Sequence, residues 1–313
     1  MEGQLPVMLI NAKQARNMPG RKTDVNDATW LAQLAAHNLL IGSFIPPEPI
    51  RQLRDLTRNR SSLVHDRTKV YQRMEKFLES SGNKISAVVS SLTGVSARNM
   101  LDAPVDGHLD PQLLANMAQG RLRQKIPDLI DALEGRFTTR HEFMMRLFLK
   151  QADGLDVMIR ELDEQIEDAM TPFCEAASSI STIQGLSDTS TEVVIAEIGV
   201  DMSVLPDAAH LAPWAGVCPG PNESAGRSQS SHTRGGNSYL KAALSTAALN
   251  ATRQKNTFLA ARFRRLYPCR GGSRALVAIE HTILAAIWRM LSYGEVYREL
   301  GPDYYQTRNQ SMA

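Results

Sequence analysis

The chain has too few cysteines, at unsuitable spacings, for a disulfide framework or a zinc site. Cys174, Cys218 and Cys269 are the only three, and their spacing matches no metal-binding or CxxC pattern. An odd number of cysteines fits reduced thiols in a cytosol. The sequence also lacks a basic start followed by an apolar core, and Glu280 and His281 interrupt its longest apolar segment. We therefore expect a soluble cytoplasmic protein.

Acidic residues are nearly missing from one stretch and crowded into the stretch before it. Residues 209–275 hold ten Lys or Arg and one acid, Glu223, whereas residues 151–208 hold 13 acids and one base, Arg160. The net charge of +2 over 313 residues hides this reversal. The reversal predicts one face that meets a polyanion and another that is merely solvated.

The N-terminal half predicts a small α/β fragment followed by long helices. Residues 7–10 are an apolar run typical of a buried strand, and a helix is expected over residues 25–38. After a proline-rich linker, residues 48–81 and 140–170 carry apolar residues at intervals of three and four. These two helices are expected to pair as an antiparallel coiled coil, within one chain or across a dimer. Arg and Lys over residues 51–76 are expected to contact DNA or RNA.

After Pro172 the pattern changes to short helices joined by tight turns. The turn at residues 183–187 resembles a helix-hairpin-helix, in which a glycine lets backbone amides approach a phosphate, although simple packing explains it equally well. Two further helices are expected to close the fold, at residues 237–253 and 273–292.

Two aspartates stand three residues apart at the start of the predicted N-terminal helix. Asp24 and Asp27 lie in the run KTDVNDA, so both carboxylates fall on one side of the first turn. Such a pair suits Mg²⁺, which prefers oxygen ligands, and phosphoryl transfer. The alternative is a helix cap with a partner for the helix dipole.

A loop rich in serine, glycine and basic residues contains a candidate nucleophile. Ser224 lies near Arg227 and Arg234, whose guanidinium groups would stabilise charge on an attacked phosphate. The composition does not distinguish Ser224 from Ser228, Ser230 and Ser231, and a flexible or phosphate-contacting loop is the alternative.

Residues 251–275 hold seven basic residues and no acid, with three aromatic residues between them. Clustering this many uncompensated charges is unfavourable unless a polyanion is bound, and the alternative is a solvated helix face. The basic residues are Arg253, Lys255, Arg262, Arg264, Arg265, Arg270 and Arg274.

Two stretches carry a family resemblance. The first is VMLINAKQARNMPGRKTDVNDATWLAQLAAHNLLIGSFIPPEPIRQLRDLTRNR, and the second runs from IQGLSDTSTEVVIAEIG through PWAG, SAG, RGGN and YL. The first resembles the second half of the catalytic domain, and the adjoining coiled coil, of DEDD-type insertion-sequence transposases of the IS110 family. The second is similar to the C-terminal domain of the same transposases.

The resemblance implies a recombinase that moves its element by DNA strand exchange. It implies an RNase H-like domain with four acidic metal ligands, a serine nucleophile in a second domain, assembly across subunits and guidance by a structured RNA. Asp24 and Asp27 match the last two acids, Ser224 matches the serine, and Arg227 and Arg234 match basic positions beyond it. Further DNA or RNA contacts are expected from Arg21, Lys22, Arg262, Arg264 and Arg265.

The sequence departs from the family at its start. The first Asp and the Glu of the family precede the apolar strand, and only six residues stand before that strand here. We therefore expect an N-terminally truncated chain with two of the four acids and a weakened Mg²⁺ site.

The expected fold is mainly α, in three parts. Residues 1–47 form the C-terminal part of an RNase H-like α/β domain, residues 48–172 the coiled-coil region, and residues 173–313 a compact helical transposase domain with the hairpin-like turn. A homo-oligomer, a dimer or tetramer, is expected at the nucleoid in a bacterial cytoplasm.

Two other functions remain open. The first is a truncated, non-catalytic remnant that binds nucleic acid without cleaving it. The second is a structural coiled-coil protein that oligomerises and has no affinity for DNA or RNA.

Overall fold

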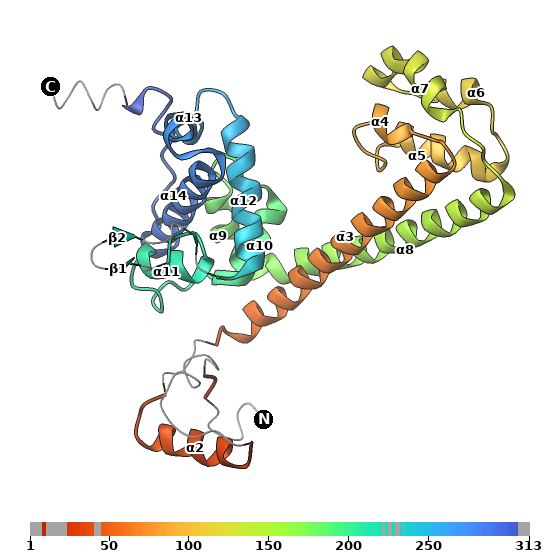
Figure 1. Ribbon diagram of the computed structural model, residues 1–313. Helices are drawn as coiled ribbons and strands as arrows, with labels where there is room; N and C mark the ends of the chain where they lie inside the picture. Colours follow the sequence, from red (N-terminus) through yellow and green to blue (C-terminus); the bar gives the residue numbers. More distant parts are fainter. Residues whose placement is uncertain are drawn as a thin grey trace. The chain divides into compact units, whose positions relative to one another are not determined.

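The structure of the protein, a computed structural model, is mostly helical (Figure 1). It describes residues 8–10, 24–40, 45–220, 223–224, 227–228, 232–233 and 235–305. The chain divides into two compact units, Leu53–Pro172 and the combination of Met1–Gln52 with Phe173–Ala313. The three-part division at residues 47 and 172 stays a prediction.

Two long helices form the frame of the unit Leu53–Pro172. They are α3 (Glu48–Ser80) and α8 (Thr139–Met170), within one residue of the helices predicted at 48–81 and 140–170. Pro46 and Pro47 precede α3, where a proline removes no helical hydrogen bond. At the start of α8, Thr138 and His141 form a reciprocal capping box, which satisfies backbone N–H groups of the first turn.

Polar contacts between α3 and α8 follow one antiparallel register (Figure 1). Arg60 pairs with Asp163 and Arg67 with Asp156, and Arg73 donates to the Gln151 amide oxygen at 3.2 Å. As the residue number rises along α3, the number of the partner on α8 falls. Val70, Ala152 and Leu155 are buried together beside these contacts. The helices therefore pair in opposite directions within one chain, while supercoiling into a coiled coil stays a prediction.

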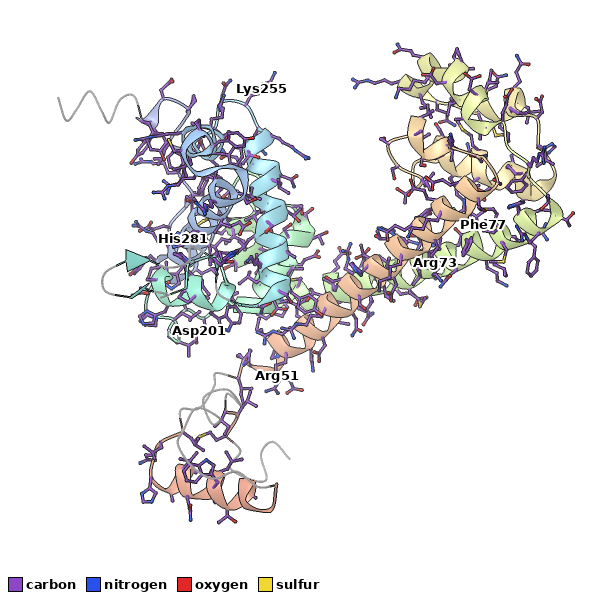
Figure 2. The ribbon with its side chains drawn as sticks, in the orientation of Figure 1. Arg51, Arg73, Phe77, Asp201, Lys255 and His281 are labelled. Carbon is purple, nitrogen blue, oxygen red and sulfur yellow. The ribbon has the colours of Figure 1, made fainter. Side chains whose placement is uncertain are left out.

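Short helices between α3 and α8 complete a separate apolar core. Met74 and Leu78 of α3 and Met145 and Leu149 of α8 are buried against these helices. The Phe77 ring contacts the Phe148 ring edge-on at 5.8 Å between centroids, and Figure 2 shows Phe77 in this part of the unit. The short helices are α4 (Ile85–Val88), α5 (Val95–Asp102), η1 (Ala103–Asp106), α6 (Pro111–Ala115), η2 (Gly120–Lys125) and α7 (Ile126–Leu133).

The second unit contains α2 and a helical C-terminal part with one small hairpin. Its elements are α2 (Asp24–Ala36), η3 (Thr171–Phe173), α9 (Cys174–Ile180), α10 (Asp188–Ile198), α11 (Ala208–Ala215), β1 (Glu223–Ser224), β2 (Arg227–Ser228), α12 (Ser238–Arg253), α13 (Phe258–Arg270) and α14 (Gly272–Tyr293). Of the strand predicted at residues 7–10, the structure describes residues 8–10, and Ile10 forms an isolated bridge. The α/β fragment stays a prediction.

The helix α14 is the core helix of the C-terminal part. Ile279, Ile283 and Ile287 are fully buried, and the helix contacts α11, α12 and α13. Among the described residues, α14 is the one helix long and apolar enough to cross a membrane. Its buried apolar face explains the same composition by packing. At its C-terminal end the Trp288 indole N–H donates to the Leu205 carbonyl oxygen at 2.8 Å.

The glycine of the hairpin-like turn serves close packing. Gly185 has φ +95°, and a Cβ atom there would lie 2.2 Å from the Ala247 carbonyl oxygen of α12. The small residues of α12, including Ala247 and Ala251, allow this approach. Only glycine fits this position, and the contact accounts for it without a bound phosphate.

The prediction of two closing helices is wrong in number. The structure has α12 and α14 close to the predicted ranges, and α13 lies between them. Pro268 lies inside α13, and closely spaced arginines hide its apolar face, so the sequence shows no clear helical pattern there. Thr257 caps α13 by accepting from the Ala260 N–H at 3.3 Å. The basic stretch predicted at residues 251–275 is therefore largely helical.

Candidate functional site

The candidate serine lies at the tip of a small hairpin. We call residues 217–236, which join α11 to α12, the serine loop. Within it β1 and β2 pair antiparallel, with Ser224 opposite Arg227 and Glu223 opposite Ser228. The register therefore brings the backbones of Ser224 and Arg227 together. The side chains of both residues, and all of Arg234, lie outside the described residues.

Backbone contacts close the base of the serine loop. Pro219 and Thr233 form an antiparallel bridge, and the Gly220 N–H donates to the His232 carbonyl oxygen at 3.1 Å. A Cβ atom on Gly236 would lie 2.3 Å from the Gly216 nitrogen. The PWAG motif, which ends at Gly216, therefore meets the RGGN motif backbone to backbone, and this contact admits only glycine at position 236.

A lysine from α12 also reaches the loop base. The Lys241 ammonium donates to the Thr233 hydroxyl at 2.9 Å. Since Lys241 lies one turn into α12, this bond ties the returning strand of the loop to a helix of the core. Sequence reasoning did not single out Lys241, because lysines one turn into a helix are common.

The predicted acids lie at the start of α2. Asp24 is the first residue of this helix and Asp27 lies three residues later, so both Cα atoms belong to its first turn. Their side chains, together with Arg21 and Lys22, lie outside the described residues. Among the residues that the structure describes, no group of three or more His, Cys, Asp or Glu is arranged to hold a metal ion.

Three arginines of α13 have different surroundings. Arg262 is half-buried and donates to the Tyr305 hydroxyl at 3.1 Å, while the Arg265 guanidinium lies 4.4 Å from the centre of the Tyr305 ring. Arg264 is exposed. The sequence predicted all three as nucleic-acid contacts, but Arg262 already has a structural partner. The role of Tyr305 was missed, because nothing in the sequence relates it to residues more than 35 positions earlier.

Most cations of the basic segment, residues 253–274, are exposed. None of the six exposed ones forms an ion pair with a carboxylate in the described part of the chain. Lys255 lies between α12 and α13, where Figure 2 labels it. Exposed cations without carboxylate partners attract a polyanion such as DNA or RNA. The six are Arg253, Lys255, Arg264, Arg265, Arg270 and Arg274.

The basic face predicted on α3 is largely engaged within its own unit. Arg60 and Arg67 pair with carboxylates of α8, and Lys69 pairs with Asp66 at 3.0 Å. These pairs neutralise part of the charge that the sequence assigned to DNA or RNA. The prediction that the basic face of residues 51–76 binds DNA or guide RNA stays a prediction, and two of its arginines also contact α8.

Two transposase family models match the chain. Residues 1–82 match a model for DEDD transposases of the IS110 type, described as "Transposase", and residues 177–264 match the "Transposase IS116/IS110/IS902 family". The second match contains the serine loop, α12 and the first half of α13, and the first contains Asp24 and Asp27. No curated protein matches the chain. By these two matches, the chain belongs to the IS110 family of insertion-sequence transposases.

Proposed function

We propose that the chain recombines the DNA of its own insertion sequence, with Ser224 as the nucleophile. The observation that carries this proposal is the register of the hairpin, which sets Ser224 opposite Arg227 within the matched transposase region. A serine at the tip of a two-stranded hairpin can approach a DNA backbone without displacing the core. The closed base of the loop further supports the assignment, because a nucleophile needs a fixed position.

The chemistry is a reversible exchange of phosphate esters. The Ser224 hydroxyl oxygen attacks a DNA phosphorus, a serine–phosphate ester forms, and the bond from phosphorus to one deoxyribose oxygen breaks. The serine proton leaves to solvent, and the released deoxyribose oxygen takes up a proton. Attack by a hydroxyl of another strand end then restores a phosphodiester and frees Ser224. Arg227 and Arg234 stabilise the charge that develops on the phosphate oxygens.

Asp24 and Asp27 have the donor chemistry for Mg²⁺. Both are carboxylates in the first turn of α2, and Mg²⁺ commonly binds one or two carboxylates while keeping several waters. A bound Mg²⁺ would neutralise charge on the phosphate during exchange. The two aspartates would hold the ion as two of the family's four acids, within an RNase H-like fragment formed by residues 1–47.

The basic segment holds the nucleic acid. Its exposed arginines on α13 and at the start of α14 bind DNA or a structured guide RNA through phosphates, and Arg21 and Lys22 add contacts near the two aspartates. Along the chain, a coiled-coil arm made of α3 and α8 separates residues 1–47 from residues 173–313. Two or four copies assemble around the DNA at the bacterial nucleoid, so that serine and aspartates from different copies meet.

Substitution of the serine tests the proposal. The full chain is expressed with a plasmid that carries the genomic DNA flanking its reading frame on both sides, and strand cleavage and excision are measured. Ser224→Ala abolishes cleavage and leaves DNA binding intact, whereas Ser228→Ala, in the facing strand of the same hairpin, retains cleavage. Full activity of Ser224→Ala rejects the proposal.

A second candidate is a remnant that binds nucleic acid without cleaving it. It is favoured by the basic segment, whose exposed cations depend on neither the serine nor the aspartates. In that case wild type and Ser224→Ala bind DNA equally, and neither forms a covalent serine–DNA adduct.

A further inference from the structure

Asn237 links three segments directly after the serine loop. Its side-chain oxygen accepts from the N–H groups of Tyr239 and Leu240, both at 3.1 Å, and so caps α12. Its own N–H donates to the Trp214 carbonyl oxygen of α11 at 3.0 Å. The side-chain nitrogen, which the cap does not use, donates to the Glu197 carboxylate of α10 at 2.6 Å.

The Glu197 carboxylate stands in an unfavourable place. The residue is 1% exposed, and it is next to last in α10, where the helix dipole opposes a negative charge. Burial of a carboxylate is costly unless hydrogen bonds compensate for the lost water. The 2.6 Å bond to Asn237 is one of the interactions that hold the buried carboxylate, and it fixes the orientation of the Asn237 amide.

The link acts on the base of the serine loop. Gly236, the last loop residue, packs against the Gly216 backbone, and Asn237 fixes the direction in which the chain leaves that contact. On the returning strand, Thr233 forms the bridge to Pro219 on the other strand. Ser224 lies at the far end of the same two strands.

We propose that Glu197 and Asn237 are positioning residues for Ser224. Glu197 orients the Asn237 amide, and this amide holds the loop base so that Ser224 and Arg227 face the DNA phosphate in a fixed register. The inference rests on the proposed function of Ser224 and adds two residues that touch neither the phosphate nor the metal.

The two ends of the Asn237 amide allow a sharp test. Asn237→Asp retains the oxygen that caps α12 but places a second carboxylate against Glu197. Glu197→Gln retains an oxygen that accepts from Asn237. The double variant, Glu197→Gln with Asn237→Asp, restores one hydrogen bond with donor and acceptor exchanged. In it the new glutamine amide donates to the new aspartate carboxylate, and the buried charge stays single.

Cleavage of the flanking-DNA plasmid and amide hydrogen exchange over residues 217–237 are measured for each full-length variant. Asn237→Asp lowers the cleavage rate by about 10- to 100-fold, as expected for a misplaced nucleophile. It also speeds exchange at the loop base by about tenfold or more. Both readouts return to within about threefold of wild type in the double variant. The free energy of unfolding is measured beside both readouts, and the inference requires that cleavage by Asn237→Asp falls under conditions in which the variant is fully folded.

Several results would overturn the positioning role of Glu197 and Asn237. Wild-type cleavage and exchange in Asn237→Asp overturn the inference, as does a folded double variant that remains as impaired as Asn237→Asp. If both aspartate variants fail to fold, Asn237→Ser is used, because serine caps α12 without reaching Glu197 or adding charge. Unchanged cleavage and exchange in Asn237→Ser overturn the inference. Ser224→Ala is measured in parallel. Full activity of this variant rejects the proposed function, whereas the amide hydrogen-exchange rates still show whether the bond between Asn237 and Glu197 holds the base of the serine loop.

Discussion

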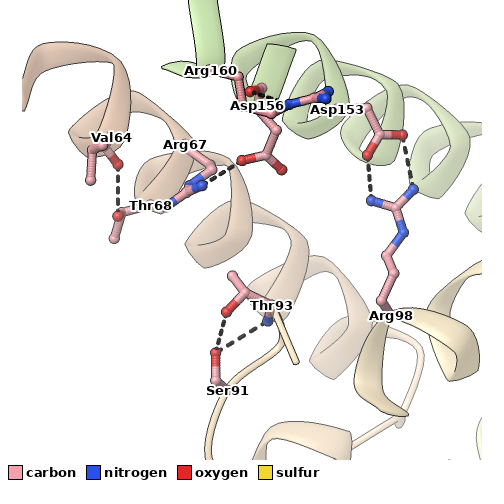
Figure 3. A network of polar contacts seen from close by, with 9 residues as sticks. All are labelled: Val64, Arg67, Thr68, Ser91, Thr93, Arg98, Asp153, Asp156 and Arg160. Carbon is pink, nitrogen blue, oxygen red and sulfur yellow. Dashed lines mark hydrogen bonds and ion pairs between the residues drawn. The ribbon is translucent and has the colours of Figure 1, made fainter. Parts of the chain in front are cut away.

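Three arginines of the helical unit and the exposed cations of the basic segment have opposite surroundings. On α3 and α5, Arg60, Arg67 and Arg98 each meet a carboxylate of α8 (Figure 3 shows the last two). In the basic segment, the exposed cations meet no carboxylate that the structure describes. Arginine therefore stabilises the fold in one unit and remains available to a polyanion in the other.

Part of the acidic stretch at residues 151–208 is neutralised by arginines of the helical unit. Asp153, Asp156 and Asp163 lie on α8, and each pairs with an arginine that comes at least 55 positions earlier. Charges that are separated along the sequence are thus combined in space. The exposed cations of the basic segment have no such partner among the described carboxylates, so we expect the nucleic-acid affinity there.

The largest expected effect follows from removing charge in the basic segment. In the variant Arg264→Gln, Arg270→Gln and Arg274→Gln, affinity for a duplex of about 30 base pairs falls roughly 100-fold at low salt. The slope of log affinity against log salt falls by about 0.9 for each DNA phosphate that the variant no longer neutralises. A salt titration of fluorescence anisotropy measures both quantities.

A matched variant in the helical unit serves as the control. Arg60→Gln, Arg67→Gln and Arg98→Gln remove the same number of charges, yet the salt slope stays at its wild-type value because these groups face carboxylates. An equal decrease of the slope in this variant would mean that arginines facing carboxylates bind DNA as well as the exposed cations of the basic segment do.

Removing the ion pairs of Arg98 is expected to lower the free energy of unfolding. Arg98 donates to both Asp153 carboxylate oxygens, at 2.5 and 2.9 Å, and to Asp102 at 2.7 Å, so it joins α5 to α8 (Figure 3). Arg98→Met lowers the free energy of unfolding by about 1–2 kcal/mol, since such bidentate pairs are stronger than ordinary surface pairs. Urea unfolding followed by circular dichroism measures the change. Arg121→Met, on an exposed residue without an ion pair to a described carboxylate, is the reference and is expected to change little.

Glu280 makes the free energy of unfolding depend on pH. Burial raises its pKa above the ordinary 4.5, although the Ser245 hydroxyl donates to it at 2.7 Å and Lys241 opposes the shift. A raised folded-state pKa adds stability below the unfolded-state pKa, and this stability is lost as the pH rises through the folded-state value. Glu280→Gln, whose amide resembles the protonated acid, removes this decline. Unfolding titrations between about pH 4 and 8 compare the two slopes, and parallel curves would contradict the prediction.

The sequence predicted the long helices well and their partners poorly. Apolar spacing persists over many turns of α3 and α8, so their bounds follow within a residue. Which carboxylate Arg60 or Arg67 meets depends on the register of two helices about 90 to 100 residues apart, which no local pattern records. The α13 helix was missed for a related reason, because Pro268 and the arginines obscure its apolar side.

The candidate site also has features that the sequence predicted and features that only the structure reveals. The resemblance singled out Ser224 among four loop serines, and the composition singled out the basic segment. The opposition of Ser224 and Arg227, and the link from Asn237 to Glu197, arise from pairings that only a folded chain displays. Asn237 carried a local signal as a helix cap, whereas Glu197 looked like an ordinary acid near a helix end.

The smallest expected effect separates two ion pairs of the same helix. Lys69 pairs with Asp66 inside α3, and both side chains are at least half exposed, whereas Arg67 reaches across to Asp156 on α8. Lys69→Met leaves the free energy of unfolding within about 0.3 kcal/mol of wild type, because an exposed pair on one helix gains little over hydration. Arg67→Met lowers it by about 1 kcal/mol, since the cross-helix pair also fixes the register. Equal values in urea unfolding would mean that the register of α3 and α8 depends on their buried apolar residues alone.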